Sequence, residues 1–111
     1  MNNAVTNTMR GAAKLGINAS EKEITAAYER LFAAKSKAND DALRASKRAL
    51  ENGVLARADY TAADDLFSSA DAMHEEPPLD RIEKHLTSGR KYLEACEEGL
   101  NHADEALGDA P

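Results

Sequence analysis

Three histidines and one cysteine are the residues of this 111-residue chain whose types suit metal binding or nucleophilic chemistry. Asp71 and His74 are three residues apart, and Glu98 and His102 are four apart, so each pair would lie on one face of a helix. The paired Glu-x-x-His motifs of di-iron bundles are absent. We therefore expect no metal site and no cofactor, and we predict that the histidines face solvent or an interface.

Cys96 is the only thiol, and three glutamates, Glu94, Glu97 and Glu98, lie close to it in the sequence. Reactive cysteines need accessible, electropositive surroundings, whereas a buried thiol behaves as a small apolar side chain. The chain has no glycine-rich phosphate loop, no Gly-x-Ser-x-Gly elbow and no Cys-x-x-Cys. These observations predict a protein that is not an enzyme. A single cysteine excludes an intramolecular disulfide and favours a reducing, cytoplasmic location.

The net charge of −6 disfavours binding to nucleic acid or to an anionic membrane surface. No window approaches the roughly 20 apolar residues of a membrane span, so we expect no membrane association. Basic residues cluster at one place in the sequence. The cluster is either a solvated helix face or a surface that binds an acidic partner. This basic cluster consists of Lys35, Lys37, Arg44, Lys47 and Arg48.

Apolar residues recur with helical spacing along nearly the whole chain, which predicts an all-α fold. We expect a short first helix ending before Gly16, and a second that begins with the capping box of Ser20 and Glu23. Asn39 or Asp40 is predicted to cap a further helix that ends at Asn52-Gly53, and Thr61 to cap the next. Whether residues 20–52 form one helix or two stays open. One apolar face is expected to form the aromatic centre of the core: Ile24, Ala27, Tyr28, Leu31, Phe32 and Ala34.

Pro77-Pro78 ends the preceding helix, because successive prolines cannot continue it. A heptad repeat then runs from Leu79 to Leu107, with leucine on one side of the seam and mostly small residues on the other. A straight helix of this length spans about 43 Å, more than the shorter helices before it would cover. We therefore predict that its distal part binds a partner, through Leu86, Gly89, Leu93, Cys96, Leu100, Ala103 and Leu107.

The segment Leu15-Gly16-Ile17-Asn18-Ala19-Ser20-Glu21-Lys22-Glu23-Ile24, with Ala27-Tyr28 and Leu31 after it, resembles the junction of the first two helices of J domains. The His-Pro-Asp tripeptide that stimulates DnaK-type ATPases is missing, since the corresponding stretch reads Ala34-Lys35-Ser36-Lys37-Ala38-Asn39. The resemblance, confined to residues 15–50, implies a degenerate J-like domain that binds another protein without activating the chaperone. A second similarity, to one helix of a tetratricopeptide repeat, also implies protein binding; it involves Tyr60, Ala63, Phe67 and Ala70.

Together these patterns predict a single-domain antiparallel bundle of four to five helices. Residues 1–76 would form its N-terminal portion, and residues 77–111 a long C-terminal helix packed on it or on a partner. The predicted function is that of a small acidic adaptor or chaperone-like protein that binds a segment of another protein chain, with a homodimer as one form of that association. The alternative is an accessory regulator of nucleic-acid transactions, of the phage or plasmid type, acting through the basic cluster.

Overall fold

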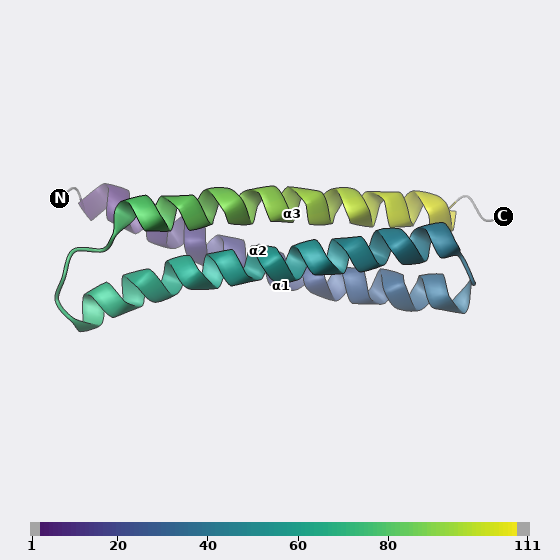
Figure 1. Cartoon of the computed structure of the whole chain (residues 1–111), viewed down its shortest axis with the longest axis horizontal. Coiled ribbons are helices and arrows are strands. Elements are labelled where there is room, and N and C mark those ends of the chain that lie inside the picture. The colour runs from purple at the N-terminus through teal and green to yellow at the C-terminus, as the bar shows by residue number, and fades with distance from the viewer. Residues whose placement is uncertain (1–2, 109–111) are drawn as a thin grey trace.

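The computed structural model describes residues 3–108 and folds them into three helices, each antiparallel to the one before it. Helix α1 spans Asn3–Ser36, α2 spans Asp40–Ala72 and α3 spans Leu79–Gly108. The helices lie side by side along almost their full lengths, which gives a rod of 58 × 19 × 15 Å (Figure 1). No strand occurs in this part of the chain. The predicted all-α bundle is confirmed, but the expected number of four to five helices is wrong.

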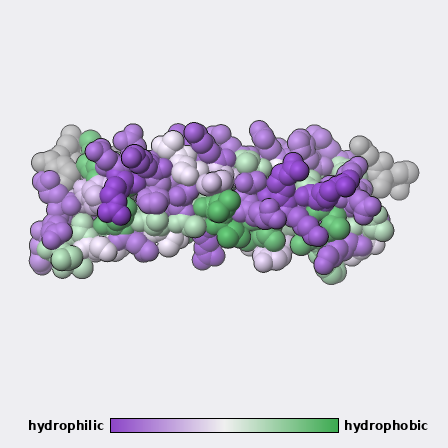
Figure 2. Space-filling model, in the orientation of Figure 1, coloured by the Kyte–Doolittle hydropathy of each residue, from purple (hydrophilic) through white to green (hydrophobic). Residues whose placement is uncertain are grey.

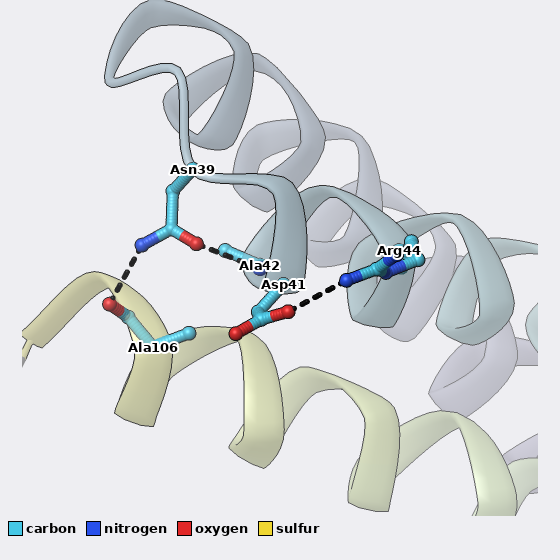
Figure 3. A network of polar contacts seen from close by, with 5 residues as sticks. All are labelled: Asn39, Asp41, Ala42, Arg44 and Ala106. Atoms are coloured by element: carbon cyan, nitrogen blue, oxygen red, sulfur yellow. Dashed lines mark hydrogen bonds and ion pairs between the residues drawn. The ribbon is translucent and has the colours of Figure 1, made fainter.

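Short polar segments separate the helices. Asn39 caps α2, as its position in the sequence predicts: its side-chain oxygen accepts a hydrogen bond from the amide of Ala42 at 3.1 Å (Figure 3). Its side-chain nitrogen donates to the carbonyl of Ala106 at 2.9 Å, so the same residue ties the α1–α2 turn to the end of α3. At the other end of the rod, α3 begins directly after Pro77-Pro78.

The predicted breaks at Gly16 and Ser20 do not occur, because both residues lie inside α1 and are buried. Ser20 does not cap a helix, and its hydroxyl instead donates to the carbonyl of Ile17 at 3.0 Å. In the same way α2 continues through Gly53 and Thr61. A glycine inside a helix costs roughly 1 kcal/mol relative to alanine, and packing against the neighbouring helices offsets that cost. Residues 20–52 form parts of two helices, with the turn near Asn39.

The C-terminal helix begins and ends close to the predicted residues, but at 30 residues it is the shortest of the three. Helices α1 and α2, with 34 and 33 residues, each match its length. The C-terminal helix was expected to extend beyond the earlier helices because the sequence predicts those helices to be short. Because those helices are continuous, they cover α3 from end to end.

The core consists mainly of small residues that recur every seven positions. Such a repeat keeps one narrow stripe of each helix against its neighbours and lets the backbones approach closely. In α1 the buried stripe is Ala13, Ser20, Ala27 and Ala34; in α2 it is Ala42, Ala49, Ala56, Ala63 and Ala70; in α3 it is Ile82, Gly89, Cys96 and Ala103.

Two large side chains from α2 fill the wider part of this core. Tyr60 lies between two glycines, Gly16 of α1 and Gly89 of α3, and each glycine leaves room for one edge of the ring. Phe67 is 1% exposed and belongs to a cluster with Ala13 and Ile82. These two layers fix how far α1 and α3 stand from α2.

Candidate partner-binding surface

The two histidines that share a ligand spacing with a carboxylate both lie on the surface of the bundle. Asp71 and His74 are exposed, as are Glu98 and His102, and Asp71 is ion-paired to Arg10 at 2.9 Å. Within residues 3–108 no three His, Cys, Asp or Glu side chains gather in a way that suits a metal ion. No helix among these residues has the length and apolar character that crossing a membrane requires.

His85 has a partner that its local sequence does not reveal. Its Nδ1 lies 2.9 Å from a carboxylate oxygen of Asp59 in α2, across the helix interface. Spacings within one helix cannot reveal such a pair, because the two residues are 26 positions apart. The contact links α2 to α3 at the level of the Tyr60 layer, and it gives this histidine a structural role.

Cys96 is fully buried at the α1–α2–α3 interface, next to the backbone of Gly53. Burial first, and then the carboxylates of Glu23 and Glu97, raise the pKa of its thiol from 9.0 to about 11. Burial and then the charge of Glu97 also raise the pKa of Glu23. A thiol in such surroundings stays protonated at neutral pH and is a poor nucleophile.

The raised pKa of Cys96 predicts a loss of stability in alkali. Above pH 9 the thiol ionises in the unfolded chain but not in the folded one, so its contribution is present below that pH and disappears as the pH rises towards 11. Between pH 8 and pH 10 the wild type should lose about 1 kcal/mol more unfolding free energy than Cys96→Ala, measured by urea denaturation. An identical pH dependence of the two proteins would show that the thiol ionises in the folded state.

The predicted partner-binding seam on α3 faces the chain's own helices. Gly89, Cys96, Leu100 and Ala103 are buried in the bundle, and Leu86, Leu93 and Leu107 are half-buried. A partner would reach the four buried residues only if α1 or α2 moved away. Partner binding by this seam stays a prediction, and the surface that the folded chain exposes lies elsewhere.

Large apolar side chains that the sequence assigns to the core lie instead on the surface of α1. Tyr28 is 58% exposed and Phe32 is 74% exposed, whereas Ala27 and Ala34 of the same helix are fully buried. The expected aromatic centre of the core is therefore wrong. Close packing of small residues leaves no room for these rings, so the inward stripe passes through the alanines beside them.

The exposed rings lie on the side of α1 that adjoins α2. Glu21 of α1 is ion-paired to Arg57 of α2 at 2.8 Å, which marks this side. Tyr28 follows Glu21 by seven residues, two helical turns, and Phe32 follows by eleven, so all three share one stripe. Lys35, three residues beyond Phe32, continues the same stripe.

Helix α2 contributes a matching stripe on the other side of this boundary. Val54, 53% exposed, precedes Arg57 by three residues, and Lys47 precedes Val54 by seven. The half-buried Leu50 lies between them. We define the α1–α2 face as Tyr28, Phe32 and Lys35 of α1 together with Lys47, Leu50 and Val54 of α2.

Leu15, another exposed apolar residue, lies apart from the α1–α2 face. Leu15 is 71% exposed, but it follows Thr8 by seven residues, and Thr8 lines a shallow hollow together with Leu86 and Arg90 of α3. Leu15 is therefore on the α3 side of α1. Figure 2, which shows one side of the rod, has its apolar surface in separate groups bordered by hydrophilic side chains.

Comparisons with family models, with curated protein sequences and with solved structures found no match for this chain. The J-domain resemblance is thus neither supported nor refuted and stays a hypothesis. The residues that carry it, Leu15 to Leu31, all lie within the continuous helix α1.

Proposed function

We propose that this protein is a protein-binding module that holds a helical segment of another protein on the α1–α2 face. The observation that carries the proposal is the exposure of Tyr28 and Phe32, four residues apart, on a bundle whose core consists largely of alanine. A chain with two phenylalanines and three tyrosines thus places one of each on the same surface stripe.

Exposed aromatic rings of this kind suit protein recognition. Each ring buries roughly 150–250 Å² when it is covered, and tyrosine is among the residues that contribute most to binding energy at protein interfaces. Two antiparallel helices with apolar residues along their boundary form a binding surface for a third helix, which is the helix-in-groove mode of recognition. The adaptor or chaperone-like role that the sequence predicts is consistent with such a surface.

The location that we propose is the cytoplasm. The single thiol, Cys96, is buried and has no cysteine partner in the chain, which suits a reducing compartment.

A co-purification experiment tests the proposed function. The wild type, the double variant Tyr28→Ser/Phe32→Ser and the control Leu15→Ser are each used to capture binding proteins from the native cell. Because the two rings supply most of the apolar contact, a protein retained by the wild type should be lost from the double variant, with a weakening of about thirtyfold or more. Leu15→Ser removes an equally exposed apolar residue from the other side of α1 and should retain the protein.

Circular dichroism must show that all three proteins are equally folded, which we expect because the substituted side chains are exposed. Retention of the same proteins by the double variant would refute the α1–α2 face as the binding surface.

A further inference from the structure

The charge of the chain is unevenly distributed around the α1–α2 face. Residues 28–48 carry six basic and three acidic side chains, a net charge of +3, although the whole chain has −6. The remainder of the chain therefore carries −9. This segment forms the end of α1, the turn and the start of α2, which is the end of the rod where Tyr28 and Phe32 lie.

Several of the basic side chains have no acidic partner in the fold. Arg30 is ion-paired to Asp104 of α3, and Arg44 to Asp41 at 2.8 Å. Within residues 3–108, the remaining four basic side chains of the segment form no ion pair. They are all exposed: Lys35, Lys37, Lys47 and Arg48.

Two of these free cations belong to the α1–α2 face itself. Lys35 continues the stripe of Tyr28 and Phe32 on α1, and Lys47 continues the stripe of Val54 on α2. The face thus has an apolar centre with a positive charge on each helix. Acidic residues also lie close to the face: Glu21 is ion-paired to Arg57, Glu29 precedes Phe32 by three residues, and Glu51 follows Lys47 by four. Asp40 and Asp41 lie in the first turn of α2, where their charges interact favourably with the helix dipole.

We infer that the segment bound on the α1–α2 face is an amphipathic helix with acidic residues flanking its apolar stripe. This inference rests on the proposed function and adds the chemical class of the partner. Leucine-like side chains of the partner cover Tyr28, Phe32 and Val54, and its carboxylates meet Lys35 and Lys47. The stripe from Glu21 to Lys35 is about 21 Å long, so the partner helix needs about four turns.

A second copy of the chain is a poorer occupant than a separate acidic helix. Helix α3 presents acidic residues to solvent, among them Glu94, Glu97, Glu98 and Glu105. The large apolar residues that are exposed among residues 3–108 come from α1, from α2 and from Met73, and none comes from α3. The acidic helix of a second copy would therefore supply charge without an apolar stripe.

Two designed helical peptides test the inference. Both carry the same leucine stripe over four turns, and the flanking positions are glutamate in one and lysine in the other. Binding of each labelled peptide to the full chain is measured by fluorescence anisotropy at low and at high salt. The acidic peptide should bind about tenfold more tightly at low salt, because Lys35 and Lys47 attract its glutamates and repel the lysines of the other peptide, and the preference should shrink at high salt.

Charge reversal on the face supplies the matched variants. Lys35→Glu/Lys47→Glu should abolish or invert the preference for the acidic peptide, and Tyr28→Ser/Phe32→Ser should weaken both peptides. Lys84→Glu/Lys91→Glu makes the same change of charge on exposed residues of α3 and should leave the preference unchanged. Equal binding of the two peptides, or a preference that survives Lys35→Glu/Lys47→Glu, overturns the acidic class of the partner.

Two further measurements test the alternative occupants of the α1–α2 face, a nucleic acid and a second copy of the chain. Single-stranded DNA that the wild type retains and Lys35→Glu/Lys47→Glu releases would replace the acidic helix with a nucleic acid. Concentration-dependent dimerisation in light scattering, lost in Tyr28→Ser/Phe32→Ser, would replace it with a second copy. The inference can fail while the proposed function stands: a protein that co-purifies through Tyr28 and Phe32 but carries no acidic amphipathic helix is that result.

Discussion

Phe67→Ala should lower the free energy of unfolding by about 4 kcal/mol, a large part of the total stability of a domain of this size. The ring is 1% exposed and packs with Ala13, Ala63 and Ile82, which are small or already fully packed and cannot fill the space that it leaves. The guanidinium of Arg10 also lies 5.1 Å from the ring centre, and that cation–π contact is lost with the ring. Urea denaturation followed by circular dichroism measures the change.

The other phenylalanine provides the control for this measurement. Phe32→Ala removes the same side chain from a site that is 74% exposed, so the unfolding free energy should change by less than about 0.5 kcal/mol. Comparable losses in the two variants would mean that Phe32 is buried and that the rotation of α1 about its axis is different. The α1–α2 face would then not exist, so this pair of variants also tests the premise of the proposed function.

Features that depend on residues close together in the sequence could be predicted. The start of α3 follows from Pro77-Pro78 and its extent from the heptad repeat, and both agree with the observed Leu79–Gly108. The cap at Asn39 likewise depends only on its own side chain and the amide three residues on. Each of these signals acts within one or two helical turns, so no knowledge of the other helices is needed.

The number of helices could not be read from such local signals. Gly16, Ser20, Gly53 and Thr61 each have the residue type of a helix end, yet each lies within a helix. What keeps the helices continuous is contact between residues far apart in the chain, such as Gly16 with Tyr60 and Gly53 with Ile24 and Cys96. These contacts outweigh the local preference of glycine against a helix interior, roughly 1 kcal/mol, and the neighbouring sequence does not predict them.

The prediction that Tyr28 and Phe32 point into the core failed for a related reason. Hydrophobicity alone favours Tyr28 and Phe32 as core residues, but the helices approach too closely for rings at those positions. One signal in the sequence does indicate this close packing: alanine at every seventh position of α2, from Ala42 to Ala70. A repeat of the smallest apolar side chain specifies a narrow interface, and large residues beside such a stripe are forced outward, where they become available to a partner.

The Tyr60 layer gives the second large effect, through a substitution that adds a single methyl group. A β-carbon on Gly16 would lie 2.6 Å from Cζ of Tyr60 and closer still to two other ring atoms. The ring cannot retreat, because its opposite edge faces Gly89, where an added β-carbon would be 3.2 Å away. Gly16→Ala should therefore destabilise the bundle by about 2 kcal/mol, even though alanine favours the helix by roughly 1 kcal/mol.

Gly11→Ala is the matched control, because it makes the same change in the same helix with nothing within 4 Å of the new methyl group. It should stabilise the protein by up to about 1 kcal/mol, so the two variants differ in sign. In a Tyr60→Leu background the smaller side chain makes room, and Gly16→Ala should then cost much less. A double-mutant cycle by urea denaturation measures this coupling. If Gly16→Ala stabilises the wild type as Gly11→Ala does, Tyr60 does not lie between Gly16 and Gly89. The close spacing of α1 and α2, which turns Tyr28 and Phe32 outward, would then have another cause.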